Sequence, residues 1–227
     1  MTKNALVVYG GFEGHRPEQC AAVFIPFLEK QGYRVHPRTT LEVYADKDFL
    51  ASLDLILQIW TLGDFTAEQG KGLSDAVRSG VGLAGFHGGI VDSWRSNPKY
   101  QWMTGGQFVA HPGCGPDTKI PSHAVNIVDR DHPITRGLPD FELQDTEQYY
   151  MIVDPGVHVL ATTTFSGEYG TPGLYPPGVV MPYAWTRTWG DGRVFVAGWG
   201  HTEKDFDEPT ALAIVERGLL WATRTSG

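Results

Sequence analysis

The sequence predicts an α/β protein built around a mainly parallel β-sheet. Short continuous apolar runs, such as residues 5–9 and 81–86, are typical of strands that are buried on both faces. Amphipathic stretches separate these runs at the spacing of βαβ units, which place successive strands parallel. Hydrophobic residues make up 41% of the 227 residues, enough for a sizeable core. We therefore expect one α/β domain over residues 1–227.

The first half of the chain has the signals of four strands and two helices. Strands are expected at residues 5–9, 33–36, 53–60 and 81–86. A helix should begin at Pro17 and stop at Gly32, because proline suits the first helical turn and glycine the position past the end. A second helix should follow Thr66, which has Gln69 at capping-box spacing, and end at Gly80.

The second half is less regular. Strands are expected at residues 123–128, 158–161, 181–188 and 193–198. The last two flank Gly190-Asp191-Gly192, a strong signal for a hairpin turn. Proline and glycine are dense at residues 105–121 and 167–178, which predicts long surface loops. Apolar residues at helical spacing predict a closing helix over residues 209–222.

Charge and cysteine content exclude several classes of protein. The net charge is −8 with no run of Lys or Arg, so we expect no nucleic-acid partner and no anionic membrane surface. No stretch has the roughly 18 apolar residues of a membrane span, and Cys20 and Cys114 form neither a disulfide framework nor a CxxC pair. We expect a cytoplasmic protein. The surplus of glycine and aromatic residues suggests tight turns, a cleft with flat apolar walls and a homodimer.

The motif GFHGG at residues 85–89 follows a predicted buried strand. Small residues around a central one are typical of a nucleophile elbow, a sharp turn that pushes the central side chain into a cleft. That residue is His87, and an imidazole suits a general base or a metal ligand better than a covalent nucleophile. The alternative is a glycine-rich turn with an exposed histidine.

Two further polar segments also follow or adjoin predicted strands. His201 and Glu203 are two positions apart after the last strand, so on an extended segment the carboxylate of Glu203 would orient the imidazole. Glu147 and Tyr149 likewise share one face of an extended segment. The alternatives are a solvated loop for the first pair and a half-buried edge strand for the second.

The remaining histidines are less specific. His111 and His132 each precede a proline and could simply satisfy a turn, the role we expect for His132. The glycine-rich segment after the first strand places Glu13 and His15 near the same rim, but it does not match the dinucleotide fingerprint G-x-G-x-x-G.

Taken in order, these motifs resemble the ThuA-like trehalose-utilisation family. The resemblance rests on VVYGG (7–11), GFHGG (85–89), FVAHP (108–112), DHPIT (131–135), GL (137–138), EQY (147–149), GRVF (192–195) and GH (200–201). The family is related in fold to class I glutamine amidotransferases, which implies a flavodoxin-like three-layer αβα sandwich. The amidotransferases have cysteine at the elbow and a late His-x-Glu pair. Here His87 replaces the cysteine, so glutamine hydrolysis through a thioester is not expected.

The resemblance implies a glucoside or a trehalose-like disaccharide as substrate, or its 3-keto derivative supplied by a sugar dehydrogenase. A keto group at C3 acidifies the C2 proton, so the chemistry needs a base and a group that stabilises the enediolate. Aromatic faces pack on sugar C–H groups, and Trp60, Trp185 and Trp199 are nearest the predicted strand ends.

The expected site is therefore composed of three sets. The catalytic set is His87, His201, Glu203 and Glu147, and the substrate-binding set is Tyr149, His111, Trp60, Trp199, Gly11, His15 and Gly88. The chemistry is either acid/base catalysis by the histidines or metal-assisted; in the second case a divalent metal such as Zn²⁺ would be held by His87, His201 and His111. The main alternative is a non-catalytic sugar-binding or regulatory module. An amidase or peptidase is disfavoured because the elbow has neither Cys nor Ser.

Overall fold

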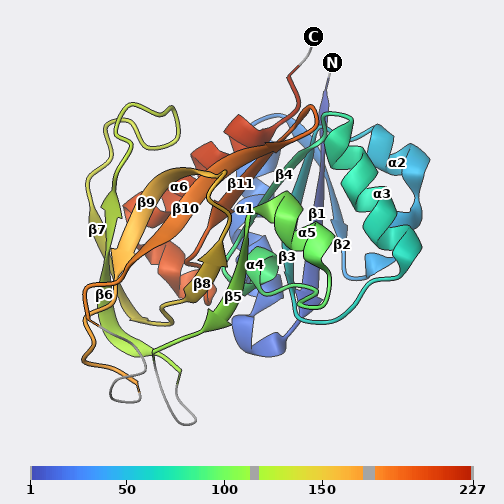
Figure 1. The fold of residues 1–227 in the computed structure, drawn as a ribbon. Helices are drawn as coiled ribbons and strands as arrows, with labels where there is room; N and C mark the ends of the chain where they lie inside the picture. Colours follow the sequence, from blue (N-terminus) through green and yellow to red (C-terminus); the bar gives the residue numbers. More distant parts are fainter. Residues whose placement is uncertain (1, 113–117, 171–176, 226–227) are drawn as a thin grey trace.

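The computed structural model describes residues 2–112, 118–170 and 177–225, and within them nine strands form one mixed sheet (Figure 1). The parallel part contains, in spatial order, β2 (Tyr33–Arg38), β1 (Lys3–Gly11), β3 (Leu55–Thr61), β4 (Gly82–Phe86) and β11 (Gly192–Ala197). The sheet continues antiparallel through β10 (Val180–Trp189), β9 (His158–Thr164), β6 (Ile120–Ile127) and β7 (Phe141–Thr146). The predicted α/β fold with a parallel centre is confirmed.

Helices cover both faces of the parallel strands. The helices α1 (Pro17–Lys30) and α6 (Pro209–Ala222) lie on one face, and α3 (Ala67–Arg78) and α5 (Pro98–Thr104) lie on the other (Figure 1). Shorter helices are α2 (Lys47–Ala51) and α4 (Gly88–Val91), with 3₁₀ turns η1 (Glu13–His15), η2 (Leu41–Ala45) and η3 (Glu203–Asp207). This arrangement is the three-layer sandwich that the family resemblance implied.

The core follows from the sequence pattern. The apolar run of β1 from Ala5 to Val8 is fully buried, as expected for a strand covered on both faces. The capping box predicted at the start of α3 is present: Thr66 Oγ1 accepts from Gln69 N, and Gln69 Oε1 accepts from Thr66 N. The closing helix has the predicted bounds. No helix in the described part of the chain is long and apolar enough to cross a bilayer.

The long loop predicted at residues 105–121 is partly wrong. Gly106–Ala110 forms β5, which pairs with β8 (Tyr150–Val153) in a separate two-stranded sheet, and β6 begins at Ile120. The helix α5 was also missed: Asn97 caps it and Gly105 ends it in a left-handed conformation, but its seven residues are too few to show a helical period. The predicted loop at 167–178 lies partly outside the described residues.

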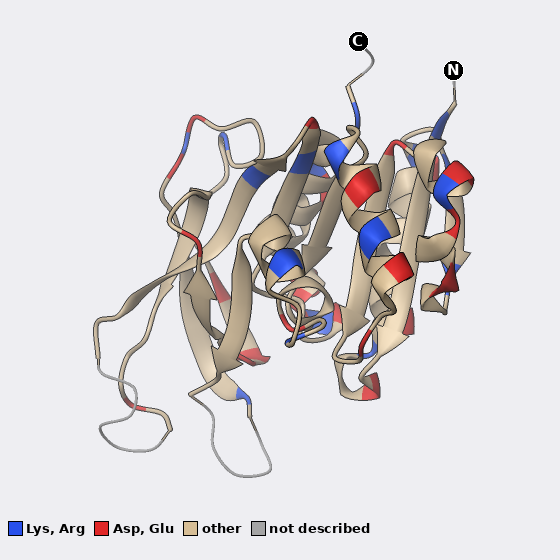
Figure 2. Ribbon diagram, turned by 45° about the vertical axis from the view of Figure 1, so that its right-hand side comes forward, with Lys and Arg blue, Asp and Glu red and all other residues tan. Residues whose placement is uncertain are grey.

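Charged side chains lie mostly on the helices and loops. On α3, Glu68, Lys71, Asp75 and Arg78 alternate in sign along the helix, and Figure 2 shows acidic and basic residues interspersed there. The carboxyl ends of the parallel strands meet at one edge of the sheet, which is where ligands bind in open α/β sheets.

Candidate functional site

The turn after β4 has the geometry of an elbow. His87 adopts φ 47° and ψ −143°, a backbone conformation that costs a non-glycine residue about 1–3 kcal/mol. Close packing leaves no room for side chains beside it: a Cβ at Gly88 would lie 2.5 Å from His15 Cε1, and one at Gly89 would lie 2.8 Å from Ile59 Cα. The glycines of the GFHGG motif thus allow the turn to sit against its neighbours, with His87 at its apex.

A buried polar network holds the elbow on β3. Gln58 Nε2 donates to the carbonyl of Gly89 at 3.1 Å, and Tyr100 donates its hydroxyl to the carbonyl of Ile90 at 2.9 Å. Ser93 Oγ donates to the carbonyl of Trp60 at 2.5 Å. The first two bonds fix carbonyls of α4 and the third ties Ser93 to β3, and none of them uses His87, so the imidazole is free to face the site.

Three histidines surround one carboxylate oxygen. Oε2 of Glu147 lies 3.0 Å from His87 Nε2, 3.2 Å from His201 Nδ1 and 3.7 Å from His15 Nε2. His15, His87 and His201 follow β1, β4 and β11, and Glu147 follows β7. One ligand atom from each residue lies within 4.8 Å of those from the others, and we call these four residues the His₃Glu cluster. The cluster is largely buried, with Glu147 5% exposed.

The hydrogen bonds of His87 define its charge state. Its Nδ1 lies 3.0 Å from the carbonyl oxygen of Gly198, which only accepts, so Nδ1 carries the hydrogen. Burial lowers the pKa of His87 to about 3, and the ring is therefore neutral near pH 7. Its Nε2 then presents a lone pair to Glu147 Oε2.

Glu147 is ionised. Burial alone would raise the pKa of Glu147, but its contacts with the imidazoles of His15, His201 and His87 outweigh burial and lower it. In addition, His201 Nδ1 is buried, and its contact with Glu147 Oε2 at 3.2 Å lacks the geometry of a hydrogen bond. A neutral His87 beside an ionised carboxylate is the protonation state in which these groups bind metal cations.

The other oxygen of Glu147 faces a different pair of residues. Thr118 Oγ1 donates to Oε1, and His111 Nε2 lies 3.8 Å from it. His111 is therefore beside the cluster, with a side chain 25% exposed, rather than within it. Of the metal set expected from the sequence, His87 and His201 lie in the cluster and His111 lies beside it, whereas His15 is the third histidine of the cluster. The sequence signal for His15 was its position in the glycine-rich segment that follows β1.

Glu203 does not orient His201 as predicted. Its Oε1 pairs with Arg16 Nη1 at 2.9 Å, and the carboxylate next to His201 is that of Glu147. The prediction assumed an extended segment, but Gly200 turns the chain at φ +103° and η3 begins at Glu203.

Asp205, which sequence reasoning missed, holds the turn instead. Its Oδ2 accepts from Gly200 N at 2.9 Å, from His201 N at 3.0 Å and from Thr146 Oγ1 at 3.0 Å. Asp205 therefore ties the loop of His201 to the residue before Glu147. The sequence offers no signal for it, because four other acidic residues stand between positions 203 and 216.

Three aromatic residues expected to contact sugar are buried. Trp199 is fully buried, packs edge-on against Phe141 and donates its Nε1 to the carbonyl of Ala211 at 3.3 Å. Trp185 is also fully buried. Tyr149 is 1% exposed and stacks on His87, with ring centroids 3.8 Å apart. The roles of Trp199 and Trp185 are corrected to core packing, and Tyr149 supports the ring of His87.

The remaining residues that the sequence singled out lie in different parts of the structure. Trp60 is half-buried and lines a pocket with Gly11, whereas Gly88 packs against His15 within the site. His132 satisfies a turn, as expected, because its Nδ1 accepts from Ile134 N at 3.2 Å. Cys20 is buried, and Cys114 lies outside the described residues.

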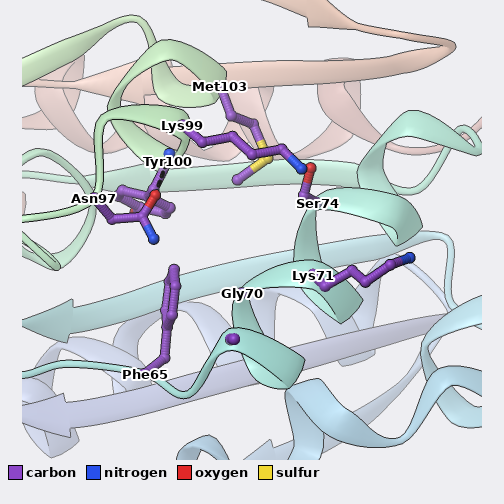
Figure 3. Close-up of a pocket in the computed structure, with 9 residues that line it drawn as sticks. Phe65, Gly70, Lys71, Ser74, Asn97, Lys99, Tyr100 and Met103 are labelled. Carbon is purple, nitrogen blue, oxygen red and sulfur yellow. Dashed lines mark hydrogen bonds between the residues drawn. The ribbon is translucent and has the colours of Figure 1, made fainter.

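A separate pocket of about 170 Å³ lies between α3 and α5 (Figure 3). Phe65, Asn97 and Tyr100 line one side, and Lys71 and Lys99 extend along the other. Lys71 is paired with Asp75 on its own helix. The pocket shares no residue with the His₃Glu cluster.

Comparisons with known proteins agree with this fold. A family model described as ThuA, trehalose utilisation, matches residues 4–222. A sequence comparison with curated proteins gives no match. Among solved structures, a protein described as ThuA-like from Bacteroides uniformis is 19% identical, with a TM-score of 0.80 over 97% of this chain and 91% of its own.

Two further structures are similar over their whole length. A ThuA-like protein from Parabacteroides merdae is 15% identical, with a TM-score of 0.73 over 100% of this chain and 93% of its own. A cytoplasmic protein from Salmonella typhimurium is 12% identical, with a TM-score of 0.66 over 98% and 100%. At these identities the structures establish the fold.

Proposed function

The chain belongs to the ThuA, or trehalose-utilisation, family, and from this premise we propose that it is a cytoplasmic enzyme of carbohydrate metabolism. Its substrate is a glucoside or disaccharide, or the 3-keto derivative that a sugar dehydrogenase would supply. The His₃Glu cluster would hold a divalent metal ion such as Zn²⁺, which would assist the reaction. The observation that carries the proposal is the convergence of His15, His87 and His201 on Oε2 of Glu147.

The His₃Glu cluster fits a metal ion in its spacing. Ligand atoms about 2.1 Å from a tetrahedral zinc ion lie roughly 3.4 Å apart. The distances from Glu147 Oε2 to the three imidazole nitrogens are 3.0, 3.2 and 3.7 Å, on both sides of that value. The buried Nδ1 of His201 supports the same assignment, because its contact with Glu147 lacks hydrogen-bond geometry and a metal ion would satisfy it. His87 has the second contact typical of a metal-bound histidine, from Nδ1 to the Gly198 carbonyl.

The chemistry divides between the ion and the residues beside it. A bound metal ion would act as a Lewis acid toward a sugar carbonyl or alkoxide. His15, His87, His201 and Glu147 would hold it. His111 stays outside this set, is partly exposed and faces Glu147 Oε1. It is the imidazole left to accept or return a proton, such as the C2 proton that a neighbouring keto group acidifies.

Product analysis with a matched pair of variants tests the proposal. Wild-type protein, Glu147→Gln and a surface control, Glu142→Gln, would be incubated with trehalose, 3-keto-trehalose and related glucosides, and the products followed by mass spectrometry. We expect turnover of at least one substrate by wild type and by Glu142→Gln, and none by Glu147→Gln. Sugar binding without turnover by wild type would favour the non-catalytic module. Equal turnover by all three proteins would show that the site is elsewhere.

A further inference from the structure

A pocket of about 300 Å³ lies where the chain reverses its direction across the sheet. From β1 the chain passes through α1 to β2 on one side, whereas β3 lies on the other side of β1 and continues through α3 to β4. Because α1 and α3 cover opposite faces, the loops after β1 and β3 diverge and leave a crevice at the carboxyl ends of these strands. Gly11 and Trp60, near the carboxyl ends of β1 and β3, and Glu13, in the turn after β1, line this pocket.

The indole of Trp60 forms a fixed apolar wall of the pocket. It lies against Gly10, where a Cβ would be 2.7 Å from Trp60 Cζ3, so only glycine lets the ring rest on the backbone of β1. The side chain is half-buried, and Pro17 at the start of α1 also lines the pocket. A flat aromatic surface held in this way suits the C–H face of a sugar ring.

Polar groups stand around this aromatic wall. Glu13, Glu18 and Thr39 line the same pocket and are exposed. Carboxylate oxygens accept hydrogen bonds from hydroxyl groups, and the threonine hydroxyl can donate or accept. Two carboxylates would repel an anionic ligand, so the lining favours a neutral, hydroxyl-rich molecule.

The pocket and the His₃Glu cluster are neighbours at the same edge of the sheet. Glu13 lines the pocket and His15 belongs to the cluster, and both are in the three-residue turn η1. Trp60 is followed in β3 by Thr61, whose Oγ1 lies 2.9 Å from His15 Nδ1. The elbow follows β4, two strands from β1, a separation of about 10 Å. Two linked sugar rings span such a distance.

We propose that this pocket is a second sugar subsite, which binds the ring that is not transformed while the reacting ring lies at the His₃Glu cluster. This proposal rests on the proposed function, which identifies the reacting ring. The second subsite makes the substrate a neutral disaccharide rather than a monosaccharide. Trp60 stacks on the second ring, and Glu13, Glu18 and Thr39 bind its hydroxyl groups.

Binding measurements on tryptophan variants test the subsite without requiring turnover. Dissociation constants for trehalose and for glucose would be measured by calorimetry with wild type, Trp60→Ala, Trp60→Phe and the control Trp102→Ala, which removes an exposed tryptophan outside the pocket. We expect Trp60→Ala to weaken trehalose binding roughly tenfold or more. Trp60→Phe should retain most of the affinity, Trp102→Ala should match wild type, and wild type should prefer trehalose to glucose.

Two results would overturn the subsite. One is that a folded Trp60→Ala, checked by circular dichroism, binds trehalose as tightly as wild type does. The other is failure of wild type to bind trehalose more tightly than glucose. Tryptophan-dependent binding of trehalose without any conversion would instead retain the subsite and reject the proposed enzymatic function, so the two failures are distinguishable.

Discussion

His87 Nε2 lies 3.0 Å from Oε2 of Glu147, although the two residues are 60 positions apart in the chain. The elbow after β4 delivers the imidazole, and the segment between β7 and β8 delivers the carboxylate. Because Nδ1 of His87 contacts the carbonyl of Gly198, Nε2 can meet Glu147 favourably only through a proton or a metal cation. Burial lowers the pKa of His87 to about 3, which disfavours the proton; in the proposed site a metal cation would take its place.

Removing the charge of Glu147 should abolish tight metal binding. Glu147→Gln keeps the size of the side chain but replaces the carboxylate that all three imidazoles face. Mutation of a residue that only hydrogen-bonds to a metal ligand typically lowers metal affinity roughly 10–100-fold. We expect a larger fall in Zn²⁺ affinity here, because Glu147 would itself be a ligand. Calorimetric titration would measure it, with Glu142→Gln on the exposed side of β7 as control. Equal affinities would remove Glu147 from the ligand set.

Asp205 should position His201. Asp205→Ala would leave the amides of Gly200 and His201 and the hydroxyl of Thr146 without their shared acceptor. We expect a loss of about 2–4 kcal/mol in the free energy of unfolding and weaker metal binding. Asp205→Asn keeps an acceptor oxygen and should restore part of the metal affinity. Denaturant titration and calorimetry would follow the two effects, and the exposed Asp207→Ala should change neither. Metal affinity unchanged in a folded Asp205→Ala would contradict the positioning role.

Gly88 should be required for the place of His15. A Cβ there would lie 2.5 Å from Cε1 and 2.7 Å from Nδ1 of His15. We expect Gly88→Ala to displace the imidazole and to cost about 1–3 kcal/mol of stability. In a His15→Ala background the same change should cost less, since the clashing ring is gone and only the contact with Thr61 Cγ2, at 2.9 Å, remains. Thermal or denaturant unfolding of the four proteins in this double-mutant cycle gives the coupling. Additive effects would show that the two residues are not in contact.

Trp199 and Trp60 should behave in opposite ways. Trp199 is fully buried, so Trp199→Ala should lower the free energy of unfolding by about 3–5 kcal/mol. In the protein that remains folded, sugar affinity should be unchanged. Trp60→Ala should affect sugar affinity more than stability. Chemical denaturation and calorimetry on both variants check this, and a specific loss of sugar binding in Trp199→Ala would restore its predicted contact with substrate.

His123 should make the protein less stable in acid. Burial lowers the pKa of His123 to about 4, below its usual value of 6.5. The unfolded chain therefore binds a proton that the native state excludes, so stability is full above pH 6.5 and falls as the pH drops toward 4. The loss should reach up to about 3 kcal/mol. His123→Gln should reduce the slope of stability against pH, as measured by urea unfolding from pH 4 to 7. The same slope in wild type and variant would show that His123 is not buried as a neutral ring.

Local signals predicted most of the fold. The buried run of β1, the capping box of α3 and the apolar spacing of α6 each reside in a short stretch of sequence and are present in the structure. The elbow at His87 was also predictable, because its glycines are adjacent in the chain. By contrast α5 and β5 are short and owe their form to tertiary packing, which overrides weak local signals.

The contacts of the site were harder to predict, because they join distant segments. The prediction that Glu203 lies beside His201 assumed an extended backbone. In the structure, the positive φ of Gly200 and the hydrogen bonds of Asp205 turn the loop. Similarly, nothing local distinguishes a buried tryptophan such as Trp199 from a half-exposed one such as Trp60. Burial is decided by how strands far apart in sequence pack together.

Metal content is the most direct test of the central claim, that the His₃Glu cluster is a metal site. Protein without a polyhistidine tag would be purified, loaded with Zn²⁺, dialysed and analysed by plasma mass spectrometry. His87→Ala would be compared with His158→Ala, which alters an exposed histidine paired with Asp129. The account predicts one zinc ion per chain in wild type and in His158→Ala, and none in His87→Ala. No zinc in wild type, or equal zinc in all three proteins, would contradict it.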